Sequence, residues 1–132
     1  MLKLTSQPSL LQKAMFANAV FSFVCGVIFL LARKLLMPHI PLAPLLWTLF
    51  GAGLILFSAQ LVIMVKSTAW AEKLIIPVIF SDIAWVILTC AALAYYQSRI
   101  SPLGNTLIIA VNMMVAALAW FQAQAYLEQG KK

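Results

Sequence analysis

Asp82 is the residue of this 132-residue chain whose type and position most clearly suggest chemistry. Of the three acidic residues it is the one inside a long apolar run, because Glu72 and Glu128 lie near the ends of such runs. An ionised carboxylate inside a bilayer costs roughly 2.5 kcal/mol or more, and no Lys or Arg lies at a matching depth. We therefore expect a neutral carboxyl group that donates a hydrogen bond. The expected acceptors are Gln60, Asn18 and Ser22.

Three roles for Asp82 are compatible with this pattern. In the first, a neutral side chain holds helices together through hydrogen bonds. In the second, the carboxyl group forms a site for a proton, a cation or a small substrate. In the third, it reaches the headgroup layer, which a helix start close to Pro77 would favour.

Four long apolar runs must position this residue. Hydrophobic residues make up 64% of the chain and charged residues 9%, against about 45–50% and about 25% in soluble domains. This composition excludes an ordinary soluble domain and a disordered chain. The nine Lys and Arg residues are spread along the chain, which excludes a nucleic-acid surface. Each run has the roughly 20 residues that a transmembrane helix needs. The runs cover residues 14–34, 42–66, 74–97 and 102–127.

The short segments between the runs predict an all-α fold. We expect a four-transmembrane-helix up-and-down antiparallel bundle, with residues 1–132 forming one membrane domain. Residues 1–13 carry leucines among polar side chains and are a candidate interfacial segment, with a frayed polar lead-in as the alternative. Pro77 lies about one turn inside the third run, so that helix either starts late or bends there.

Each run has one face that small and polar residues mark as inward, because lipid cannot satisfy polar side chains. Spacings of three and four residues place such side chains on the same side of a helix. In chain order the predicted faces are Ala14, Asn18, Ser22 and Gly26; Gly53, Phe57, Gln60 and Met64; Asp82, Trp85, Thr89, Ala92 and Tyr96; and Asn105, Asn112, Ala116, Ala119 and Ala123.

Distances from the run ends group the polar side chains into two layers. The larger layer is a candidate intramembrane polar cluster in the half of the bundle nearer the termini. A second, smaller layer lies deeper. The cluster comprises Asp82, Asn18, Ser22, Gln60 and Gln122, and the second layer comprises Thr89 and Asn112.

The distribution of basic residues predicts the orientation of the bundle. The end with both termini carries six lysines, and the other end carries Arg33, Lys34 and Arg99. The positive-inside rule then places both termini in the cytoplasm, and we expect the membrane to be a bacterial inner membrane. Aromatic residues near the run ends suit the headgroup level. They are Trp47, Trp70, Tyr95, Tyr96 and Tyr126.

The remaining residues form no catalytic or metal-binding constellation. His39, the single histidine, lies in a proline-rich loop and is expected to be a solvated interfacial side chain. Cys25 and Cys90 lie inside separate runs, so we expect two small core residues and no disulfide. The chain has no nucleophile paired with a base and no Gly-rich phosphate loop. We therefore expect no enzyme activity, no cofactor and no bound metal.

Two segments carry a resemblance to a family. One is Asn18-Ala-Val-Phe-Ser-Phe-Val-Cys-Gly26 with the Leu-Leu-Ala that ends at Ala32, and the other is Asp82-Ile-Ala-Trp-Val86. Both are similar to segments of small bacterial four-helix integral membrane proteins that have no assigned activity, and this resemblance implies the same fold over nearly the whole chain. The length also resembles that of small multidrug transporters. Those proteins carry their essential acid in the first helix, where this chain has Asn18 and Ser22.

Two functions are compatible with these observations. The first is a non-enzymatic accessory, assembly or interaction protein that acts within the bilayer, through contacts with lipids and with a membrane-protein partner or further copies of the chain. The alternative is a small oligomeric carrier or channel that uses the polar layer around Asp82 for a proton or small solute. A single bundle of four helices has little room for an aqueous path, which favours the first function.

Overall fold

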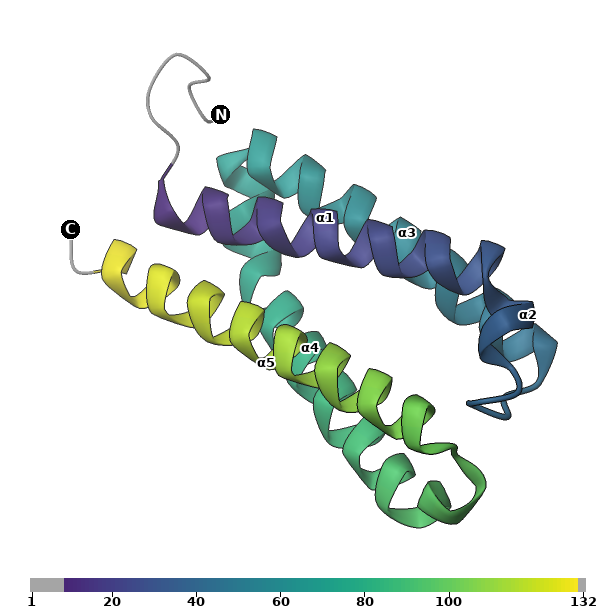
Figure 1. The fold of residues 1–132 in the computed structure, drawn as a ribbon. Coiled ribbons are helices and arrows are strands. Elements are labelled where there is room, and N and C mark those ends of the chain that lie inside the picture. Colours follow the sequence, from purple (N-terminus) through teal and green to yellow (C-terminus); the bar gives the residue numbers. More distant parts are fainter. Residues whose placement is uncertain (1–8, 131–132) are drawn as a thin grey trace.

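The computed structural model describes residues 9–130 of the chain, and nearly all of them are helical. Four long helices run alternately in opposite directions (Figure 1), which confirms the predicted all-α up-and-down bundle. They are α1 (Leu10–Leu31), α3 (Pro44–Lys66), α4 (Thr68–Tyr96) and α5 (Pro102–Gly130). The short helix α2 (Arg33–Leu36) and the 3-10 helix η1 (Gln97–Arg99) lie in the connections.

Each of the four long helices is long and apolar enough to cross a membrane, by its length and composition. The chain is therefore an integral membrane protein. The start of α1 and the end of α5 lie at the same end of the bundle, which we call the termini end (Figure 1). The opposite end, which we call the loop end, holds α2 and η1 (Figure 1).

Side-chain caps set the beginnings of the helices. Ser9 and Gln12 form a capping box, in which each side chain accepts a hydrogen bond from the backbone N–H of the other residue. Helix α1 therefore begins at Leu10, before the predicted residue 14. Residues 10–13 of the candidate interfacial segment belong to α1, and residues 1–8 lie outside the described part of the chain.

Helix α4 begins earlier than the apolar run suggested. The Ser67 side chain accepts a hydrogen bond from the backbone N–H of Trp70, so the helix starts at Thr68 and not at residue 74. Pro77 is inside the helix, and the expectation of a late start close to it is wrong. The missing N–H of Pro77 leaves the carbonyl group of Lys73 without its usual helical donor.

The helices form two antiparallel pairs. Helix α1 packs mainly on α3 and α4 packs mainly on α5, while contacts of α1 with α5 and of α3 with α4 join the pairs. Gly26 and Gly51 bring α1 and α3 very close together, because a Cβ atom at Gly26 would lie only 2.8 Å from the Gly51 carbonyl oxygen. The buried apolar cluster lies towards the termini end and comprises Leu11, Met15, Ala19, Leu61, Met64, Ala71, Ile75, Val78 and Ala125.

The predicted inward face of α1 is confirmed, because Ala14, Asn18, Ser22 and Gly26 are all buried. The predicted face of α3 is confirmed only in part, because Met64 is buried and Phe57 packs against the buried cluster, whereas Gly53 is exposed. Nothing lies within 4 Å of a Cβ atom at Gly53, so that position faces outward. The α3 face follows the close approach of Gly51 to α1 instead. Its buried residues are Trp47, Gly51, Ser58, Leu61 and Met64.

Two further positions expected to face inward on α4 are exposed. Ala92 and Tyr96 follow Asp82 along the helix, but Asp82 is the last buried residue of α4. On α5 the prediction is confirmed for Asn112 and Ala119, whereas Ala116 is exposed. On α4 burial ends at Asp82, so regular helical spacing no longer indicates an inward side beyond it, whereas Ala116 lines a groove between α4 and α5.

Trp47 is enclosed, unlike the other aromatic rings near the helix ends. It is 1% exposed and packs edge-on against Phe29 of α1, with ring centroids 5.2 Å apart. Its ring therefore faces α1 and is not exposed to the surroundings, because the close α1–α3 contact encloses the first turn of α3. Trp70, Tyr95, Tyr96 and Tyr126 are exposed, as rings at the ends of membrane helices should be.

Candidate functional site

Asp82 lies inside the bundle and accepts two hydrogen bonds. Its side chain is on α4 and the residue is 6% exposed. Oδ2 accepts from Nδ2 of Asn18 on α1 at 2.8 Å and from Nε2 of Gln122 on α5 at 3.2 Å. The role in which Asp82 reaches the headgroup layer is therefore wrong, because the carboxyl group is held between helices.

The same two amides also bond to each other. Asn18 Nδ2 donates to Gln122 Oε1 at 2.9 Å, which closes a ring of three side chains from three helices. We call Asn18, Asp82 and Gln122 the polar triangle. Asn18 and Gln122 are 2% and 0% exposed, and the hydroxyl group of Ser22 donates to Asn18 Oδ1 at 3.2 Å.

The ring fixes which atoms of the amides donate. Both N–H groups of Asn18 are used, one on Asp82 and one on Gln122, and its oxygen accepts from Ser22. Asp82 therefore acts as an acceptor at Oδ2, where the sequence led us to expect a donor. Within residues 9–130, Oδ1 of Asp82 has no hydrogen-bond partner.

Four of the five residues expected in the polar cluster come together, and Gln60 does not. Gln60 is half-buried and makes no side-chain hydrogen bond within the described part of the chain. Ser58 is the buried polar residue of α3, and its hydroxyl group donates to the Ala19 carbonyl oxygen at 2.7 Å. Sequence reasoning missed Ser58, although it lies two helical turns after Gly51 on the same face.

The predicted second layer is present closer to the loop end. The Thr89 hydroxyl group lies 2.7 Å from Asn112 Oδ1, and Asn112 Nδ2 lies 3.6 Å from the sulfur of Cys90. The Thr89 hydroxyl group also lies within hydrogen-bond distance of the carbonyl oxygens of Trp85, at 2.7 Å, and Val86, at 3.1 Å, so three acceptors compete for its single proton. This layer joins α4 to α5 only.

His39 connects the two helix pairs at the loop end. Its Nδ1 lies 2.9 Å from the Ser101 hydroxyl group, and its carbonyl oxygen accepts from the Ser101 N–H at 3.0 Å. The residue is half-buried, so the expectation of a freely solvated side chain is wrong. Cys25 and Cys90 are both free, as predicted, but the expectation that both are core residues is wrong, because Cys90 is exposed and Cys25 is only half-buried. Within residues 9–130, no three His, Cys, Asp or Glu side chains gather as metal ligands would.

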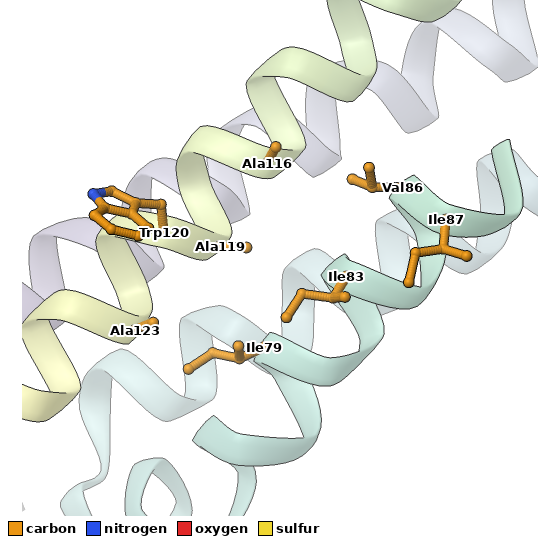
Figure 2. A pocket seen from close by; sticks show the side chains of 8 residues that line it. All are labelled: Ile79, Ile83, Val86, Ile87, Ala116, Ala119, Trp120 and Ala123. Carbon is orange, nitrogen blue, oxygen red and sulfur yellow. The ribbon is translucent and has the colours of Figure 1, made fainter. Parts of the chain in front are cut away.

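A groove between α4 and α5 is the remaining candidate site (Figure 2). It has a volume of about 260 Å³, and every residue that lines it is apolar. Sequence reasoning missed this groove because it assigned Ala116 and Ala123 to the inward face of α5. The lining residues are Ile79, Ile83, Val86, Ile87, Ala116, Ala119, Trp120 and Ala123.

The fold and the site together define a class of protein, an all-α membrane protein with four long helices, three of which are joined by a buried polar triangle. The chain was compared with family models, with curated proteins and with solved structures, and none of them matches it. Its function must therefore be inferred from its own residues.

Proposed function

We propose that this protein is a non-enzymatic accessory, assembly or interaction protein that acts within the bilayer. The observation that carries this proposal is the closed hydrogen-bonded ring of Asn18, Asp82 and Gln122. Polar side chains that satisfy one another hold helices together within a bilayer. The bundle then presents apolar side chains to lipids and to a membrane-protein partner or further copies of the chain.

The short connections support the same proposal. Only Ser67 separates α3 from α4, and only residues 100 and 101 separate η1 from α5. Connections of this length cannot form a separate binding domain outside the membrane. A partner must therefore be met within the bilayer or at its surface.

Capture of partners in mild detergent tests the proposal. We expect the tagged full-length chain to retain one specific membrane protein, or a second copy of itself, at a fixed ratio. Ala116→Leu and Ala59→Leu add the same bulk to two exposed faces, one in the α4–α5 groove and one on α3. A partner held by one face should be lost with one variant and kept with the other. Retention of lipids alone would contradict the proposal.

We also propose that the protein lies in a bacterial cytoplasmic membrane with both termini in the cytoplasm. The proposal rests on the excess of lysine at the termini end of the whole sequence. Ala43→Cys and Ala69→Cys test it in a chain that lacks Cys25 and Cys90, because both alanines are exposed and lie at opposite ends of the bundle. A membrane-impermeant thiol reagent should label intact cells at position 43 and not at position 69. The reverse pattern would invert the orientation.

A small oligomeric carrier or channel for a proton or small solute is the second candidate function. The observation that favours it is the free Oδ1 of the buried Asp82 carboxyl group. Asp82→Asn keeps the size and an acceptor oxygen but cannot ionise, so a carrier should lose proton-coupled flux in proteoliposomes. Unchanged flux and unchanged cellular function with Asp82→Asn would eliminate this candidate.

A further inference from the structure

The two oxygens of the Asp82 carboxyl group have different surroundings. Both amide donors, from Asn18 and Gln122, converge on Oδ2 at 2.8 and 3.2 Å. Within residues 9–130 no donor reaches Oδ1. The polar triangle therefore holds one carboxyl oxygen and leaves the other open.

No charged side chain of the described residues balances Asp82. The side chains that face it are Asn18 and Ser22 from α1 and Gln122 from α5. The charged and titratable groups on these helices and on α3 lie towards the helix ends or in other layers. They are Lys13 and Cys25 on α1, Lys66 on α3, Glu72, Lys73, Cys90, Tyr95 and Tyr96 on α4, and Tyr126 and Glu128 on α5.

The number of free oxygens decides which cation could balance the carboxylate. Hard metal cations such as Ca²⁺ and Mg²⁺ take about six or more oxygen ligands. Here Asn18 Oδ1 already accepts from Ser22 and Gln122 Oε1 already accepts from Asn18, so Oδ1 of Asp82 is the one side-chain oxygen of the polar triangle without a bonded donor within residues 9–130. One free oxygen is too few for a metal ion, whereas a proton needs only one.

We propose that Asp82 binds a proton at Oδ1 and exchanges it with water at the termini end of the bundle. A water-borne proton forms an O–H bond with a lone pair of Oδ1, and the reverse step returns it to water. Oδ2 accepts both amide N–H groups in either state, so the polar triangle does not rearrange. The inference goes beyond the proposed function, because an accessory protein and a carrier could both hold this proton.

The place of the polar triangle suits exchange at the termini end. Asn18 lies little more than one helical turn from Lys13 on α1, and Gln122 lies less than two turns from Glu128 on α5. The exposed Lys13 and Glu128 mark the nearby end of the bundle. The loop end is farther away along α1 and α5, with the second layer at Thr89 and Asn112 between, whereas Asp82 lies midway along α4.

Infrared spectroscopy of the full chain in lipid vesicles tests the inference directly. Glu72→Gln with Glu128→Gln removes two exposed acids and leaves Asp82 as the one acidic side chain of the sequence. We expect this double variant to show the C=O stretch of a protonated carboxyl at neutral pH. The band should shift on transfer to D₂O and should be lost when Asp82→Asn is added.

Every outcome of this experiment bears on the inference. If the double variant shows only carboxylate bands at neutral pH, Asp82 does not hold a proton and the inference is wrong. This measurement needs no substitution within the polar triangle. A carboxyl band that does not shift in D₂O would show that the proton on Asp82 does not exchange with water. A carboxyl band that remains after Asp82→Asn would assign the proton elsewhere. The spectrum depends neither on partner capture nor on flux. The inference about the proton can therefore be wrong while the proposed function is correct, and the proposed function can be wrong while the inference is correct.

Discussion

Asn18 on α1 donates from its amide nitrogen to Oδ2 of Asp82 on α4 at 2.8 Å, although 64 positions separate the two residues in the sequence. This bond joins the α1–α3 pair to the α4–α5 pair in the interior of the bundle. The nitrogen atom of Asn18 also donates to Gln122 on α5, so one side chain links three helices.

Asn18→Ala should destabilise the bundle more than Ser22→Ala. The first change leaves Gln122 Oε1 without a donor and Asp82 with one donor, and buried unsatisfied groups cost about 1–3 kcal/mol each. The second removes only the neutral bond to Asn18 Oδ1, which is worth about 0.5–1.5 kcal/mol. Unfolding by SDS in mixed micelles measures the free energy of unfolding of each variant. Equal losses would show that the polar triangle contributes no more than Ser22 does.

Gly26→Ala should destabilise the bundle, and Gly53→Ala should not. A Cβ atom at Gly26 would meet the Gly51 carbonyl oxygen at 2.8 Å, whereas nothing lies within 4 Å of one at Gly53. Overpacking of this kind costs about 1–3 kcal/mol, and alanine in place of an exposed helical glycine can add up to about 1 kcal/mol. The same SDS titration compares the two variants. A harmless Gly26→Ala would mean that α1 and α3 can move apart freely.

Polar residues explain which parts of the fold and the site could be predicted. On α1 and α4, Asn18, Ser22 and Asp82 mark the inward side, because an unpaired polar group in lipid is costly. On α3 the polar signal is divided, because Ser58 and Gln60 lie on nearly opposite sides of the helix, and the close approach of Gly51 to α1 places Ser58 on the inward side. Gln60 was misplaced for this reason, and Ser58 was missed.

The bonding pattern inside the polar triangle was also beyond the sequence. Helical spacing brings Asn18, Asp82 and Gln122 to one depth, but it cannot decide which amide atom faces which oxygen. The pattern depends on rotamers and on the crossing of α1, α4 and α5. The groove between α4 and α5 could not be predicted from the sequence for the same reason. An alanine on the inward face of α5 and an alanine that lines the groove look alike in the sequence, and only helix packing distinguishes them.

Ser101→Ala should loosen the loop end of the bundle. The Ser101 hydroxyl group caps α5 by accepting from the Gly104 N–H at 3.0 Å and also lies 2.9 Å from His39 Nδ1. Loss of a serine cap costs about 0.5–2 kcal/mol. Ser67→Ala, which removes only the longer cap of α4 at 3.5 Å, should cost less. A double-mutant cycle of Ser101→Ala with His39→Ala should give a coupling of at least about 0.5 kcal/mol. Additive losses would show that the His39 contact is energetically neutral.

Trp47→Phe should leave the stability of the bundle unchanged or raise it. Trp47 is 1% exposed, and within the described residues its indole Nε1 has no hydrogen-bond partner. A buried donor without an acceptor is destabilising by about 1–3 kcal/mol, and phenylalanine removes it while keeping an aromatic ring against Phe29. Trp47→Ala is the matched control and should cost about 3–5 kcal/mol through the cavity that it leaves. Unfolding free energies in mixed micelles compare the three chains. A loss of about 0.5–1.5 kcal/mol for Trp47→Phe would contradict the prediction and would indicate that Nε1 donates to a bound water molecule, because a hydrogen bond to a neutral acceptor is worth that much.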